Sequence, residues 1–398
     1  MTAWTRISVF ATCLAAVACV PATDPGAGRT AAAGEASLPA FAERDRVRGP
    51  DALFDPAERS RDFLRNNGAT GAPMGERVCP RPKDLASDAE IGAAAQASIQ
   101  AQAAGPVSTN APRDFARLLN TSAFRYLMDR DAGRARRDVD LLRRHAEADA
   151  WIPSASSWSA ASSAVQAMLP LLPAWQILRQ TSAASDADHA AIDGWLARVD
   201  RFTEVHPGDD YVGTARGANR MMLGAMTGND ALYRSGVQGG YMAQLRAMRP
   251  DGSFPLETTR GRNALNTSTN NVRLMVYAAE IAASRGVDLY GVDVDGRSLH
   301  DAVGFVLDAR ADNALVDRYA AANESPPADA ADFRPGAQLD PFEGSTSKGW
   351  AKLYVQRFPT SDAAARIRAI RSFEAWLQAD NTGGYVSCWG SRFGSSRP

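Results

Sequence analysis

The 398-residue chain has little of what marks several common classes of protein. Its formal net charge is −1 at pH 7, so no overall field draws a polyanion, which argues against a general nucleic-acid binder. It has four cysteines and four histidines, with neither the H-E-x-x-H nor the C-x-x-C pattern of a zinc site. A P-loop, a G-x-G-x-x-G turn and a G-x-S-x-G elbow are also missing from the sequence. We therefore expect no metal and no cofactor.

Long apolar runs are scarce as well, and the one near the N-terminus, Ile7–Val20, is too short to span a bilayer as a stable helix. With Arg6 before it and small residues after it, Met1–Ala22 has the layout of a secretory signal peptide. We expect cleavage after Ala22 and a periplasmic protein without a stable transmembrane segment. An alternative is a lipid anchor on Cys19, which follows a degenerate lipobox that lacks the usual leucine.

Removal of the signal leaves two cysteines, Cys79 and Cys388, one near each end of the expected domain. An exported compartment permits a disulfide between them, and this is our prediction. The alternative is a pair of unrelated buried thiols.

The rest of the chain divides into a linker and one large domain. Residues 23–77 are rich in Ala, Gly, Pro and charge, which predicts a flexible linker. Within 78–398, apolar residues recur every three or four positions, as in Ile192, Trp195, Leu196 and Val199. No sustained alternation of the strand kind occurs. The domain is therefore predicted to be all-α, and its wide apolar helix faces suit a two-layer ring of helical hairpins.

The segment from Asp251 to Leu289 carries the most information. It has an Asp-Gly turn, a piece expected to be extended (Phe254 to Glu257), then Arg260-Gly261 and Ala264-Leu265 before an apolar helix. This resembles the alginate lyases, in which a DG-x-LP-x-E-x-x-RG-x-x-AL string leads into the active-site helix. The resemblance runs over roughly residues 79–359. It implies an incomplete (α/α) toroid that binds a uronate-containing anionic polysaccharide and cleaves it by β-elimination.

The chain departs from that family where the chemistry is expected. The family tyrosine falls at Asn270, and the family Asn-Asn-His motif corresponds to Arg216–Met222, where Asn219 stands for an asparagine and the histidine is replaced by Arg220 or Asn219. We retain Asn219 and Arg220 as catalytic candidates. Lys83 matches a lysine loop that lines the family's cleft.

Other polar and aromatic residues are candidates for substrate binding. Arginine grips carboxylates with two parallel hydrogen bonds, so arginines and asparagines of the two motif segments are predicted to form a carboxylate-binding surface. The set is Arg216, Arg220, Arg260 and Arg262 with Asn219, Asn263, Asn266 and Asn270, and Trp158 is added as a platform for a sugar ring. The alternatives are core packing for Trp158 and salt bridges from the arginines to Glu257, Asp209 and Asp210.

Proton transfer needs a residue other than the missing family pair. His206 and Tyr211 lie closest to the motif segments and are the best candidates, because a positioned side chain can give or take a proton. The other histidines are expected to be structural or on the surface. Loss of the family pair also supports a second function, a catalytically inactive polysaccharide-binding protein in export or assembly. Glycosidase action through carboxylates such as Asp209 and Asp210 is a further alternative.

Overall fold

The computed structural model describes residues 86–101, 110–153, 157–322, 333–342 and 349–370. Over these residues the regular structure is helical and no strand occurs, which confirms the all-α prediction. The signal peptide, the linker, Lys83, Cys79 and Cys388 lie outside the described residues. The α-helices are α2 (Asp88–Gln100), α3 (Ala111–Asp129), α4 (Ala132–Glu147), α5 (Trp158–Leu178), α6 (Asp186–Phe202), α7 (Tyr211–Thr227), α8 (Asp230–Gly236), α9 (Ala243–Ala247), α10 (Pro255–Thr258), α11 (Ala264–Ser284), α12 (Leu299–Ala311), α13 (Ala314–Ala320), α14 (Gly349–Arg357) and α15 (Asp362–Arg368).

Several helices begin at side-chain caps that can be recognised in the sequence. Ser87 and Glu90 form a capping box at α2, and Ser185 and Asp188 form another at α6. In each, the serine oxygen accepts from a backbone N–H of the first turn while the acid accepts from the serine N–H. Asp210 caps α7, because its side chain accepts from the N–H groups of Val212 and Gly213.

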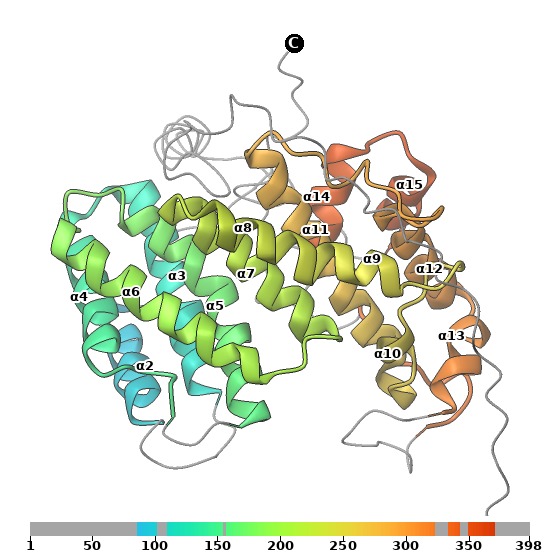
Figure 1. The fold of residues 1–398 in the computed structure, drawn as a ribbon, viewed down its shortest axis with the longest axis horizontal. Helices are drawn as coiled ribbons and strands as arrows, with labels where there is room; N and C mark the ends of the chain where they lie inside the picture. The colour runs from blue at the N-terminus through green and yellow to red at the C-terminus, as the bar shows by residue number, and fades with distance from the viewer. Residues whose placement is uncertain (1–85, 102–109, 154–156, 323–332, 343–348, 371–398) are drawn as a thin grey trace, which may run out of the picture. The chain divides into compact units, whose positions relative to one another are not determined.

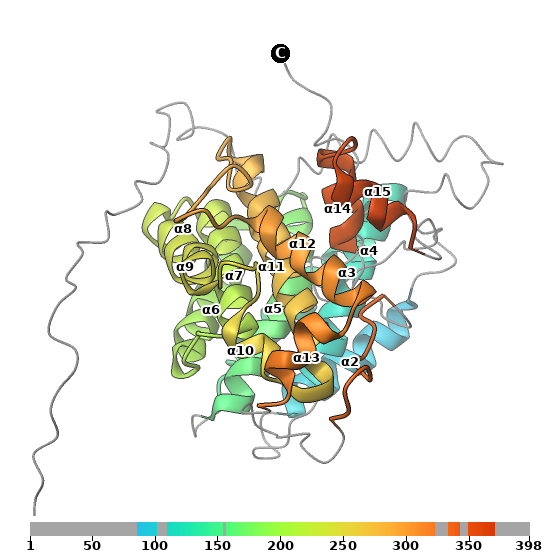
Figure 2. The same ribbon diagram turned by 90° about the vertical axis from the view of Figure 1, so that its right-hand side faces the viewer.

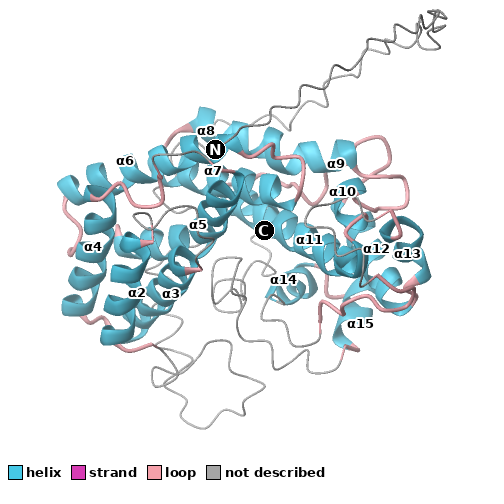
Figure 3. Ribbon diagram, turned by 90° about the horizontal axis from the view of Figure 1, so that it is seen from below, coloured by secondary structure: helices cyan, strands magenta, loops and turns pink. Residues whose placement is uncertain are grey.

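The helices pack as neighbouring pairs around the buried helices α5, α7 and α11. Figure 3 shows them along an open arc that runs from α4 and α2 through α5, α7 and α11 to α12 and α13. Figure 1 follows the same path in colour, from α2 in blue to α15 in red. In Figure 2, α11 passes between α7 and α12, both of which it contacts. This arrangement is the predicted incomplete (α/α) toroid.

Close contact between backbones fixes α7 against its neighbour. The chain from Asp230 to Ala247 contains a π-helical segment, Val237–Met242, between α8 and α9. A Cβ on Gly217 of α7 would lie 2.5 Å from the Cα of Gly240 in that segment, so only glycine allows this approach. The π-helical turn also rotates the chain that follows it, which contains Gln244.

One local prediction was wrong. Phe254 is extended, as expected, but the residues after it form the short helix α10. Proline has a fixed φ and lacks an N–H, which suits the first position of a helix, and Pro255 occupies it.

Among the helices of the described ranges, none has the length and apolar character needed to cross a membrane.

Candidate functional site

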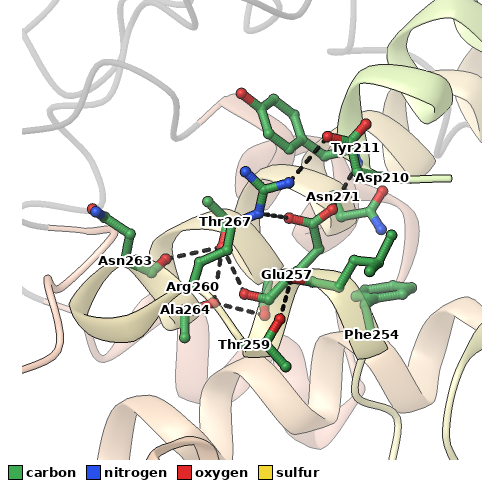
Figure 4. A network of polar contacts seen from close by, with 12 residues as sticks. Asp210, Tyr211, Phe254, Glu257, Thr259, Arg260, Asn263, Ala264, Thr267 and Asn271 are labelled. Atoms are coloured by element: carbon green, nitrogen blue, oxygen red, sulfur yellow. Dashed lines mark hydrogen bonds and ion pairs between the residues drawn. The ribbon is translucent and has the colours of Figure 1, made fainter. Parts of the chain in front are cut away.

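The N-terminal end of α7 meets α10 and the start of α11 at a buried group of charges (Figure 4). Asp210 caps α7 through Oδ1, which accepts from the N–H of Val212 at 2.9 Å. Its other oxygen, Oδ2, accepts from Arg260 at 3.0 Å. The Nε of Arg260 lies 3.3 Å from Glu257 Oε2, while Glu257 Oε1 accepts from the N–H of Tyr211 at 2.6 Å. One guanidinium therefore holds two carboxyl groups and joins α10 to α7.

Two buried carboxyl groups beside a single guanidinium leave one negative charge without a counterion if both ionise. Glu257 is 1% exposed, and burial, partly offset by Arg260, raises its pKa to about 8. We conclude that Glu257 holds a proton at neutral pH, while Arg260 pairs with Asp210. The Arg260 side chain is 19% exposed, so part of it remains accessible to a ligand.

Tyr211 is the first residue of α7 and is half-buried. The guanidinium carbon of Arg260 lies 5.5 Å from the centroid of its ring. In Figure 4 the phenol points away from the two carboxyl groups. Burial, reinforced by the charge of Glu257, raises the pKa of the Tyr211 phenol above its usual value. At neutral pH the group is therefore a proton donor far more than a base.

His206 is buried and supports an exposed aromatic ring. It is 2% exposed, and its Nδ1 accepts from the N–H of Gly208 at 3.1 Å. The indole of Trp158, which is 49% exposed, stacks on the imidazole with ring centroids 5.0 Å apart. His206 Nε2 lies 3.9 Å from Asp210 Oδ1, and burial lowers the pKa of the imidazole. The imidazole of His206 is thus uncharged and shielded from solvent, and it supports the exposed indole of Trp158 by stacking.

A second layer of hydrogen bonds holds the segment before α7. The Asn271 side chain accepts from Thr214 Oγ1 at 2.6 Å and donates to Gln244 Oε1 at 2.7 Å. Gln244 Nε2 in turn faces the backbone oxygens of Asp209 and Asp210 at 3.4 and 3.5 Å. Residues of α7, α9 and α11 therefore set the position of Asp210.

Residues 333–342 lie far along the chain and hold the turn of residues 260–263 that precedes α11, here called the arginine turn. Gln338 Oε1 accepts from the N–H of Leu265 at 3.2 Å, and its Nε2 donates to the carbonyl of Gly261 at 3.1 Å. The N–H of Leu339 donates to the carbonyl of Arg262 at 3.0 Å. Gln338 thus supplies the helix cap that the Asn263 side chain does not provide.

The remaining predicted residues fall into two groups. Asn219, Arg220 and Arg216, all on α7, make contacts away from Arg260. Asn219 donates to the carbonyl of Val165 on α5, Arg220 pairs with Asp200 and Glu204, and Arg216 donates to the carbonyls of Thr203 and His206.

The second group lies around the arginine turn. Arg262 and Asn263 are half-buried residues of the turn itself, and Asn270 is half-buried on α11. For Arg260, the structure shows the salt bridges to Glu257 and Asp210 that the sequence offered as an alternative. The anchoring roles of Gln244, Asn271 and Gln338 were missed, because their partners lie far away in the sequence. The Asp-Asp-Tyr run before α7 was the available signal for the cap at Asp210.

Comparisons with known proteins agree with this fold. The alginate lyase family model matches residues 138–315. Alginate lyase A1-III from Sphingomonas species A1 is 22% identical, with a TM-score of 0.61 and coverage of 87% of this chain and 98% of that one. A tyrosine-to-phenylalanine variant of alginate lyase A1-III in complex with a tetrasaccharide is 21% identical, with a TM-score of 0.64 and coverage of 86% and 96%. No curated protein sequence matches. At these identities the structural likeness shows the fold.

Proposed function

We propose, from the match of residues 138–315 to the alginate lyase family model, that the chain binds a uronate-containing anionic polysaccharide and cleaves it by β-elimination. The observation that carries this proposal is Arg260, a partly exposed guanidinium fixed between α10 and α7 beside the phenol of Tyr211. Arginine is suited to grip the carboxylate of a uronate. The stacked Trp158 offers an apolar ring face for a neighbouring sugar.

Elimination removes the proton from C5 of the uronate, forms the C4–C5 double bond and breaks the bond from C4 to the glycosidic oxygen, which takes up a proton. Arg260 would neutralise the carboxylate and so stabilise the charge that develops as the C5 proton leaves. Tyr211 would take that proton as phenolate and return it to the leaving oxygen. Because the pKa of Tyr211 is raised, little phenolate exists at neutral pH, and turnover would be slow there.

A second candidate function is a polysaccharide-binding protein without catalysis, and a specific observation favours it. His206, the histidine nearest the site, is buried under Trp158 and cannot reach a bound polymer. The partly exposed Arg260 can hold a carboxylate beside its bond to Asp210, but the site lacks a ready base at neutral pH.

Ultraviolet absorbance of the unsaturated product separates the two functions. The mature protein is incubated with polymannuronate, polyguluronate and polyglucuronate, and binding of each polymer is measured in parallel. We expect absorbance to rise with one of them and to stay flat for Tyr211→Phe, while the control Tyr126→Phe on α3 behaves as wild type. Binding without any rise in absorbance would support the inactive protein, and absence of both would refute the proposed site.

Export to the periplasm is part of the proposal and rests on residues 1–22. The test is the mass of the protein recovered from a periplasmic extract. Loss of the first 22 residues supports simple cleavage, whereas an N-terminal lipid on Cys19 would support the anchored form.

A further inference from the structure

Two asparagines are the only half-buried residues in an otherwise buried part of α11. From Ala264 to Ala282, every residue of α11 is buried except Asn266 and Asn270, which are half-buried. They are four positions apart, so they share one face of the helix and are separated by about 6 Å along its axis. The other faces of α11 contact α7, α10, α12, α13 and α14.

The neighbours of these asparagines have internal partners, whereas the two side chains do not. Ser268 and Thr269 donate to backbone carbonyls of the preceding turn, and Asn271 joins Thr214 to Gln244. Within the described part of the chain, the amide groups of Asn266 and Asn270 make no hydrogen bond. Asparagine has a low helix propensity, so its presence at positions 266 and 270 does not stabilise α11.

We propose that Asn266 and Asn270 form an amide strip that binds the hydroxyl groups of the sugar next to the uronate held by Arg260. This inference rests on the proposed function and adds a direction to it, since the polymer would run along α11 away from the arginine turn. An amide presents both a donor and an acceptor, which matches a sugar hydroxyl. The ligand class is therefore a polyuronate recognised through its hydroxyl pattern as well as its charge.

The position of the strip supports this assignment. Asn266 lies less than one helical turn beyond Asn263, which closes the arginine turn. Gln338 bonds the backbone at Gly261 and at Leu265, so the turn and the first residues of α11 form one fixed unit. Leu339, which is 45% exposed, follows Gln338 and adds an apolar surface beside Arg262. Residues 338–339 are thus hydrogen-bonded to the backbone on both sides of Arg262, directly before Asn266.

The test measures the affinity of the mature protein for polymannuronate and polyguluronate at low and high salt. We expect Asn266→Ala and Asn270→Ala each to weaken binding by about three- to tenfold, as for loss of a neutral hydrogen bond. The ratio to wild type should be the same at both salt concentrations, because such a bond is not screened. Asn270→Asp should weaken binding more, and more at low salt, because it places a negative charge against a polyanion.

The matched control is Asn313→Ala, which removes a half-buried asparagine at the start of α13. Alanine is the better helix former, so both strip variants should fold as wild type does, which circular dichroism checks. Wild-type affinity in both alanine variants, with the wild type still binding, would overturn this inference alone. No binding by the wild type would overturn the proposed function and the inference together.

Discussion

Replacing Glu257 with glutamine tests the electrostatic account of the site directly. The substitution keeps the size of the side chain and an oxygen that can accept from the N–H of Tyr211, and it removes the ionisable proton. Glu257 is 1% exposed and burial raises its pKa to about 8, from an ordinary value of 4.5. The wild type therefore folds with a protonated carboxyl at a pH at which the unfolded chain carries a carboxylate.

The sign and size of the effect follow from that difference. A carboxyl group whose pKa is raised on folding contributes stability that is fully present below pH 4.5 and is lost as pH rises through about 8. Each pH unit within this window changes the free energy of unfolding by up to about 1.4 kcal/mol, so the roughly 3.5 units between 4.5 and about 8 give a ceiling of about 5 kcal/mol. Glu257→Gln should lose this dependence on pH.

The variant should also show a small cost that does not depend on pH. The glutamine amide nitrogen would take the place of Glu257 Oε2, 3.3 Å from Arg260 Nε, so two donor groups would face each other at a cost of about 1 kcal/mol. At pH 5 the variant should therefore be less stable than the wild type, and near pH 8 it should be more stable. The two curves of unfolding free energy against pH should cross.

Urea denaturation followed by circular dichroism at several pH values between 5 and 8.5 measures both curves. The control is Glu147→Gln, which removes an exposed carboxylate at the end of α4 and should leave the pH dependence unchanged. If Glu257 is instead ionised and paired with Arg260 throughout, the variant should lose about 3 to 5 kcal/mol at every pH. Parallel curves with that separation would refute the reasoning.

Three further predictions concern single side chains. If Tyr211 is the base, turnover should rise about tenfold per pH unit from neutral pH upward, because the phenolate fraction rises about tenfold per unit at any pH below the raised pKa of Tyr211. A rate that does not depend on pH would contradict this. His206→Phe should keep the stack under Trp158 and preserve polymer binding, whereas His206→Ala should weaken polymer binding. If His206→Phe loses turnover but keeps binding, the imidazole transfers protons. Gly217→Ala should lower the free energy of unfolding by about 1 to 3 kcal/mol, measured by urea denaturation, since its Cβ would lie 2.5 Å from Gly240 Cα.

Local patterns in the sequence account for much of the fold and for part of the site. The capping box of Ser185 and Asp188 and the spacing of apolar residues that follows it predict α6 directly. The spacing of Glu257 and Arg260, three positions apart, allowed the salt bridge that the structure shows. These features depend on neighbours within one turn, so the sequence alone can reveal them.

Other features depend on contacts between distant segments and could not be predicted. The burial of His206 follows from the stacked indole of Trp158, which belongs to another helix. Asn271 binds Thr214 and Gln244, which lie 57 and 27 positions away. Composition and periodicity carry no information on such partners. For this reason the sequence groups Arg216, Asn219 and Arg220 with Arg260, although in the structure they bond to partners other than Glu257 and Asp210.

The bonds from Gln338 to the arginine turn also bear on the order in which the molecule is made. Gln338 lies 73 positions after Leu265 and 77 positions after Gly261. The turn that holds Arg260 therefore has its full set of partners only after nearly the whole domain has been synthesised. Pairings between such distant residues form late, because closing a long loop costs chain entropy first. A nascent chain would therefore lack the full set of bonds around Arg260, and the proposed polymer binding would begin only after folding is complete.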